Sequence, residues 1–156
     1  TYPTLFFFLM RRPPPRSTLS PSSAASDVYK RQALDELKKA INTDEKSFMS
    51  NRTLRFSVRY AIIQLVEAAA DLSITILERK FGERVGSYRE IFKKLSIHGV
   101  IPPRISESMS KLASLRNMIV YSWDVDDYRI YVEAKRGIKT VEEFIREVYD
   151  YALKDC

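Results

Sequence analysis

The longest hydrophobic pattern in the chain runs from about Arg52 to Phe81. Its apolar residues recur at intervals of three and four, the spacing of a helix face that packs on a core; they are Leu54, Val58, Ala61, Ile62, Leu65, Ala69, Leu72 and Ile76. A second stripe widens the apolar surface and consists of Tyr60, Ile63, Val66 and Ala70. Because a helix with so much apolar circumference packs on more than one side, we expect it at the centre of a bundle or in a dimer interface.

Shorter patterns predict four more helices around this one. The first covers Ala33 to Asn42, with Leu34, Leu37 and Ile41 at helical spacing. Another begins near Tyr88, behind the capping-box sequence "SYRE", and ends at His98-Gly99.

The next helix begins at Pro102-Pro103, because proline suits a helix start, and runs to about Tyr121. The last is expected to open at Thr140, where "TVEE" has the form of a second capping box. No strand pattern competes, so the predicted fold is an all-α bundle of about five helices.

Residues 1–32 differ from the rest in composition, with five of the seven prolines and none of the four glycines. Their apolar run "LFFFLM" is short for a secretory core, and its arginines follow it instead of preceding it. The run is also too short to span a membrane. The segment, in particular "SSAASDVYKRQ", resembles a translated sequencing adapter. We expect an artefactual or disordered tail at 1–32 and one domain at 33–156.

This division changes the meaning of the charge. The chain has 26 basic and 20 acidic residues and a net charge of +6, but residues 1–32 hold five of the basic residues and only one acid. The domain therefore carries a net charge of only +2. The high isoelectric point is mostly a property of the tail, so it does not indicate a nucleic-acid-binding surface.

The residues available for chemistry are few. His98 is the only histidine and Cys156 the only cysteine, so neither a metal site nor an internal disulfide is expected. This cysteine usage fits a cytoplasmic location. The chain has no glycine-rich phosphate loop, and we expect no cofactor. His98 falls in the last turn of a helix, where a cation interacts favourably with the helix dipole, so we expect it to be structural or exposed.

The stretch "LRNMIVYSWDVDD", residues 115–127, places Arg116 and Asn117 in an apolar helix. An arginine fork can bind phosphate. Alternatively, Arg116 forms a buried or interface ion pair with Asp124, Asp126 or Asp127, the three acids that follow. We interpret the aromatics Trp123 and Tyr128 as core or interface residues rather than as platforms for stacked bases.

Several segments in order carry a resemblance to a known family: "EAAADL", "SYREIFKKLSIHGVI", "LRNMIV", "WDVDD" and "GIKTVEEFI". The domain resembles the HepT-like branch of the HEPN superfamily, which consists of small all-α proteins of prokaryotic toxin–antitoxin pairs. The resemblance implies a metal-independent ribonuclease that acts on RNA, commonly as a homodimer. It also implies a minimal nucleotidyltransferase as the antitoxin partner, which in some pairs attaches AMP to a motif tyrosine.

The family signature is arginine, four residues, histidine, one residue, tyrosine. Arg116 matches the arginine, and Asn117 matches the polar residue that often follows it. Tyr121 then stands at the histidine position and Trp123 at the tyrosine position. Alternatively, one residue is lost before "WDVDD", and Tyr121 is the motif tyrosine and the possible AMP acceptor. Under either alignment the histidine is absent.

The missing histidine matters because RNA cleavage needs a group that takes the 2′-OH proton. Histidine, with a pKa of about 6.5, exchanges protons near neutral pH, whereas tyrosine, at about 10, is a poor base. Residues five apart also differ by about 140° around a straight helix. Arg116 and Tyr121 therefore share one site only if the helix ends between them or a second copy completes it.

Three hypotheses follow for the candidate catalytic residues Arg116, Asn117 and Tyr121. The first is a HepT-like toxin component with weak or lost ribonuclease activity, paired with a nucleotidyltransferase antitoxin and not bound to a membrane. The second is a non-catalytic helical module that keeps the fold and binds that antitoxin. The third is an unrelated helical interaction protein.

Overall fold

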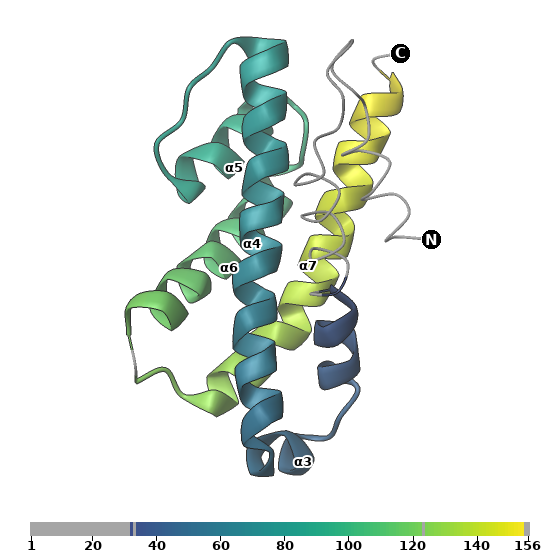
Figure 1. Ribbon diagram of the computed structural model, residues 1–156. Helices are drawn as coiled ribbons and strands as arrows, with labels where there is room; N and C mark the ends of the chain where they lie inside the picture. The colour runs from purple at the N-terminus through teal and green to yellow at the C-terminus, as the bar shows by residue number, and fades with distance from the viewer. Residues whose placement is uncertain (1–31, 33, 123, 155–156) are drawn as a thin grey trace, which may run out of the picture.

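The computed structural model describes residue 32, residues 34–122 and residues 124–154. The predictions about residues 1–31, Trp123 and Cys156 lie outside these ranges. Residues 34–41 are helical, and five further helices follow: α3 (Glu45–Ser50), α4 (Arg52–Phe81), α5 (Tyr88–Ile97), α6 (Pro103–Tyr121) and α7 (Asp127–Lys154). The described residues contain no strand, and the predicted all-α fold is confirmed. In Figure 1, α4 runs along the middle, with α5 and α6 on one side and α3 and α7 on the other.

Helix α4 has the bounds that its hydrophobic pattern predicts. Asn51 caps its first turn, accepting a hydrogen bond from the Leu54 amide at 3.1 Å, and Gly82 closes it with a φ of 63°. Both apolar stripes contribute to the core through Val58, Ile62, Leu65, Val66, Ala69 and Ala70. The helix is long and apolar enough to cross a bilayer, but more than half of its most apolar window is buried inside the bundle. Its central position in the core accounts for its apolar character.

Helices α5 and α6 also begin and end as predicted. Ser87 accepts a hydrogen bond from the Glu90 amide at 3.2 Å. The Glu90 carboxylate reaches back to the amide of Gly86, at 3.0 Å, one residue before the serine. Gly99, with a φ of 74°, follows the end of α5, and Pro103 opens α6.

The predicted start of the last helix is wrong. Helix α7 begins at Asp127, and Thr140 lies in its interior. Three buried residues before Thr140, namely Ile130, Tyr131 and Ala134, continue the apolar stripe toward the N-terminus. Because packing on that stripe holds the earlier turns in place, "TVEE" serves as ordinary helix sequence and not as a cap.

Helix α3 was not predicted, because six residues are too few to show a period. Asp44 caps it, accepting hydrogen bonds from the amide and the hydroxyl of Ser47 at 2.9 and 2.7 Å. Phe48 anchors it in the core at 1% exposure, with its ring centroid 5.0 Å from that of Tyr131 on α7. A local cap and one buried aromatic therefore define this element.

Candidate functional site

Arg116 projects from α6 toward α4, where it forms an ion pair with Glu67. Its side chain is only 16% exposed. Its Nη1 atom donates a hydrogen bond to the side-chain oxygen of Asn117 at 3.1 Å. Two of the three sequence-predicted site residues, Arg116 and Asn117, are therefore in contact.

The expected partners of Arg116 are wrong, although the ion pair itself is present. Asp127 pairs instead with Arg55 and Arg59 of α4, at 3.0 and 2.6 Å. The side chain of Asp126 accepts a hydrogen bond from the amide of Tyr128 at 3.1 Å. These acids lie beyond the end of α6, near the first turns of α4, whereas Arg116 lies further back along α6, beside the middle of α4.

Tyr88, the first residue of α5, completes this cluster. Its hydroxyl donates to Glu67 Oε1 at 2.6 Å, the same oxygen that Arg116 contacts. The Arg116 guanidinium lies over the Tyr88 ring, 5.4 Å from its centroid. Burial, followed by the hydrogen bond to Glu67, raises the pKa of Tyr88 to about 12. The phenol therefore stays protonated at neutral pH, and one carboxylate oxygen links α4, α5 and α6.

Both terminal nitrogens of the Arg116 guanidinium take part in these contacts. Its Nη2 atom binds Glu67 and its Nη1 atom binds Asn117. Its Nε atom is buried and has no hydrogen-bond partner within the described residues. Each terminal nitrogen keeps a second N–H, so a phosphate group that reaches this mostly buried side chain competes with the Glu67 carboxylate for the same positive charge.

Tyr121 lies apart from the cluster within one chain. It is the last residue of α6 and is 77% exposed. Because α6 is helical through Tyr121, the helix does not end between the two residues, and Tyr121 lies about 140° around the axis from Arg116. The structure thus brings Arg116 and Asn117 together and directs Tyr121 to another side.

His98 has the structural surroundings that its position predicts. Its Nε2 atom lies 2.5 Å from Glu83 Oε1, and its ring stacks on Phe81 with centroids 3.9 Å apart. Lys94 contacts the other oxygen of Glu83 at 2.7 Å. The hydrogen bonds from Lys94 and then from His98 hold the pKa of Glu83 below its ordinary value.

His98 also lies far from the cluster. It follows the last residue of α5, whereas Arg116 contacts Tyr88 at the first. Ten residues separate the two ends, about 15 Å along a helix axis. His98 therefore cannot replace the missing histidine within one chain.

Sequence reasoning missed Glu67 and Tyr88 as parts of the site. The signal for Glu67 was present, because it is the only charged residue between Tyr60 and Asp71 in an otherwise apolar helix. Acids in such surroundings are paired. Tyr88 gave no comparable signal, because the sequence pattern at the start of α5 is explained by the capping residues around it.

Comparison with known proteins adds to this geometry. The model of the family described as "Ribonuclease HepT-like" matches residues 30–148. No curated protein matches the chain at a significant level. Several solved structures share the fold, at identities too low to show more than the fold.

Three of these structures illustrate the likeness. A toxin–antitoxin crystal structure with AMP-PNP has a TM-score of 0.71 at 19% identity. The match covers 80% of this chain and 95% of the chain in that structure. A tri-AMPylated HEPN toxin of Shewanella oneidensis, in complex with an MNT antitoxin, has a TM-score of 0.64 at 22% identity and covers 76% and 95%. The cytosolic protein YutE of Bacillus subtilis, of unknown function, has a TM-score of 0.65 at 16% identity and covers 82% and 91%.

Proposed function

This chain belongs to the HepT-like ribonuclease family of the HEPN superfamily, and we propose that it is a toxin component that binds cytoplasmic RNA and cleaves it weakly or not at all. The proposal rests on the residues that α6 carries at the positions of the family signature. Arg116 and Asn117 are in contact, but Tyr121 stands where the family signature requires a histidine.

The chemistry explains the expected weakness. Cleavage by transesterification needs one group that accepts the 2′-OH proton and another that protonates the leaving oxygen. Arg116 can hold the phosphate in competition with Glu67, and the Asn117 amide can donate a hydrogen bond. A tyrosine hydroxyl can donate a proton, but it is a poor acceptor near neutral pH. Binding without a proton acceptor gives only part of a catalyst.

A homodimer would complete the site. Within one chain Arg116 and Tyr121 point to different sides of α6, so a shared site needs Tyr121 of a second copy. Exposed aromatics support such an interface: Phe56 and Tyr60 of α4 are 57% and 59% exposed. They lie 11 and 7 residues before Glu67, which places all three on one face of α4. Burying this face beside Arg116 would remove apolar surface from water.

A nucleotidyltransferase antitoxin is the proposed partner. Two of the similar structures are toxin–antitoxin assemblies, and in one of them the toxin is tri-AMPylated. Tyr121 is 77% exposed in the single chain, so its hydroxyl is open to attachment of AMP. Co-expression with such a partner should add AMP to the wild-type protein and not to the Tyr121→Phe variant, as measured by intact mass.

The central experiment measures cleavage of a mixed RNA pool by the wild type and by Arg116→Ala, with EDTA present. We expect almost no cleavage by either protein and weaker RNA binding by Arg116→Ala. Robust wild-type cleavage that Arg116→Ala abolishes would overturn the weak-activity proposal. The Glu67→Gln and Tyr121→Phe variants would then identify the group that takes the proton.

The second candidate is a non-catalytic module that binds the antitoxin alone. The ion pair that occupies Arg116 favours it, because this contact makes the residue a structural link between helices. Absence of both cleavage and RNA binding, with retained antitoxin binding, would support this alternative.

A further inference from the structure

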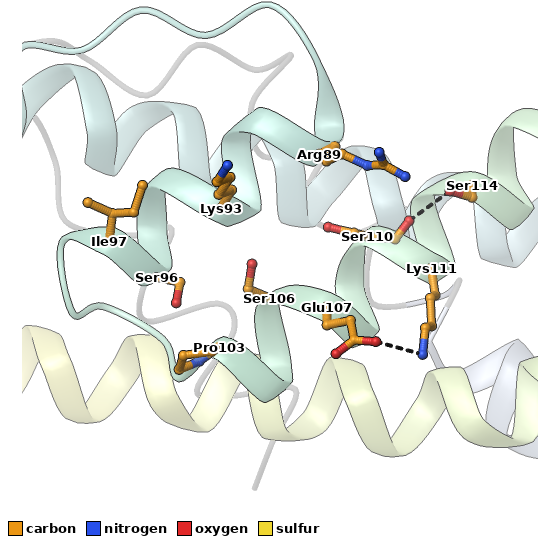
Figure 2. Close-up of a pocket in the computed structure, with 10 residues that line it drawn as sticks. All are labelled: Arg89, Lys93, Ser96, Ile97, Pro103, Ser106, Glu107, Ser110, Lys111 and Ser114. Atoms are coloured by element: carbon orange, nitrogen blue, oxygen red, sulfur yellow. Dashed lines mark hydrogen bonds and ion pairs between the residues drawn. The ribbon is translucent and has the colours of Figure 1, made fainter.

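An open groove of about 550 Å³ lies between α5 and α6, away from the Arg116–Glu67 contact. Figure 2 shows its two walls. Helix α5 contributes Arg89 and Lys93 to the lining, and α6 contributes Ser106, Ser110 and Ser114. The groove thus combines cationic and hydroxyl groups, and no aromatic side chain lines it.

Arg89 and Lys93 form no ion pair within the described part of the chain. Both side chains are exposed, and no carboxylate of the described residues pairs with either. They stand four residues apart on α5, so their like charges repel and weaken the helix. Lys111, also in the lining, pairs with Glu107 at 3.0 Å, so these two charges cancel. The lining therefore has a net charge of +2, which comes from Arg89 and Lys93.

The hydroxyl groups supply a second, independent observation. Ser106 is 8% exposed, and its side-chain hydroxyl has no hydrogen-bond partner in the described part of the chain. Figure 2 shows this hydroxyl in the space between the two helices, beside Ser96 of α5. The Ser106 hydroxyl is not one of the described side-chain atoms that are sealed from solvent without a partner. It is therefore open to the groove and free to bind a group that enters there.

The groove leads toward the candidate site. Ser110, Ser114, Asn117 and Tyr121 follow one another at intervals of four, three and four, so they form one stripe along α6. Ser114, Asn117 and Tyr121 are exposed and Ser110 is half-buried. The serine-lined wall of the groove therefore continues along the surface to Asn117, which contacts Arg116.

We propose that the α5–α6 groove binds the phosphodiester backbone of single-stranded RNA and guides the strand to Asn117 and Arg116. Guanidinium and ammonium groups bind phosphate oxygens, and serine hydroxyls donate to them. Contacts of this kind position a strand without reading its bases. The inference rests on the proposed function, since it names the path by which RNA reaches that site.

The test measures the affinity of a labelled single-stranded RNA of mixed sequence by fluorescence anisotropy over a range of salt concentrations. The variant Arg89→Gln/Lys93→Gln removes both unpaired charges. The control Lys39→Gln/Lys46→Gln removes two exposed lysines near and on α3, which Figure 1 places across α4 from α5. All four side chains are exposed, so both variants should fold, as circular dichroism will show.

We expect the groove variant to bind roughly tenfold more weakly than the control at moderate salt. The slope of log affinity against log salt should fall in magnitude by about 1.4, because each phosphate contact to a single strand contributes about 0.7. Ser106→Val should also weaken binding, with little change in this slope, because it removes a hydrogen bond and no charge.

Equal affinities of the groove variant and the control would overturn the inference, and RNA binding that still depends on Arg116 would leave the proposed function intact. Loss of affinity in the groove variant, with none in Arg116→Ala, would uphold the groove and reject the proposed site. A poly-glutamate peptide that binds through Arg89 and Lys93 while RNA binding is unchanged would assign the groove to an acidic protein segment, again overturning the inference. A wild type that binds no RNA would also overturn it, and the cleavage assay would then decide the proposed function separately.

Discussion

Arg116 illustrates how the neighbours of a residue determine what it can do. The guanidinium keeps a geometry suited to phosphate, but its terminal nitrogens bind Glu67 and Asn117. One face of its plane lies over the aromatic ring of Tyr88. The mostly buried ion pair stabilises the junction of three helices and competes with any anionic ligand. The contact with Glu67 therefore stabilises the fold and, under the proposed function, opposes the binding of RNA by the same guanidinium.

Restoring a histidine should raise cleavage. Tyr121→His returns a group that exchanges protons near neutral pH. If one residue has been lost before "WDVDD", an inserted histidine after Val120 will be the effective change, because a shift of one residue turns a side chain by about 100°. Cleavage of the RNA pool in EDTA should increase for one of the two proteins. The increase should vanish when Arg116→Ala is added, and an increase that survives Arg116→Ala would contradict the shared site.

Neutralising Glu67 should weaken folding and strengthen RNA binding. Glu67→Gln leaves the Arg116 charge mostly buried with a weaker partner, which costs about 1 kcal/mol because Glu67 itself is partly exposed. The released guanidinium becomes available to phosphate. Urea unfolding and anisotropy with labelled RNA measure the two effects. Tyr88→Phe is the matched control, since it removes a hydrogen bond to the same oxygen without freeing Arg116, and an equal gain in RNA affinity there would count against this explanation.

Acidification should destabilise the contact between Glu83, Lys94 and His98. The hydrogen bond from Lys94, and then that from His98, holds the pKa of Glu83 below its ordinary value of 4.5. A depressed pKa in the folded state stabilises the protein above pH 4.5, and this stabilisation is lost as the pH falls through the folded value. Melting temperatures between pH 7 and pH 3 should therefore fall less steeply for Glu83→Gln than for Glu107→Gln, whose ion pair lies within a single exposed helix.

At the scale of the elements, α6 and α7 approach each other closely at Gly137. A Cβ added there would lie 2.9 Å from Cδ1 of Leu112, a buried residue of α6. Glycine in a helix interior is less favourable than alanine by about 1 kcal/mol, so the close approach accounts for its presence. Tertiary packing here outweighs local preference.

The background at position 112 should decide the effect of Gly137→Ala. In the wild type, the contact with Leu112 should cancel the gain in helix propensity. In a Leu112→Ala background, the new methyl group has space, and Gly137→Ala should stabilise the protein by about 1 kcal/mol. Urea denaturation of the four proteins gives the coupling energy. Equal effects in the two backgrounds would show that Leu112 is not the obstacle.

At the scale of the whole molecule, one face of α4 presents large apolar side chains that no other described helix covers. Eleven of the 30 residues of α4 are buried, but Phe56 and Tyr60 remain more than half exposed. They lie on the face that carries Glu67, so an interface there would adjoin the Arg116 cluster. A dimer formed through this face would therefore link the oligomeric state to the candidate site.

Self-association should depend on these two aromatics. Sedimentation at tens of micromolar should show a dimer for the wild type and a monomer for Phe56→Ser/Tyr60→Ser. The control Met49→Ser/Leu153→Ser removes two exposed apolar residues on α3 and at the end of α7 and should leave the dimer intact. A monomeric wild type, or a control that also dissociates, would contradict this interface.

The sequence by itself determined the elements whose signals are local. The period of α4, the Ser87 cap and the Pro103 start placed three helices correctly, because side-chain periodicity and capping are read within a few residues. The resemblance to the HepT-like signature showed that the motif histidine is absent. The capping-box pattern at Thr140 produced the one wrong helix start, because packing of the preceding apolar residues continues the helix through that position.

Only the tertiary structure decided which residues meet. The three residues that meet in the cluster, Glu67, Tyr88 and Arg116, lie far apart in the sequence. The periodicity of a single helix cannot predict a contact between side chains of three different helices. The sequence suggested the following aspartates as partners of Arg116, because they are near in the chain. The crossing of α4 and α6 instead places a carboxylate from the middle of α4 against the guanidinium, and that crossing is set by how three apolar faces pack together.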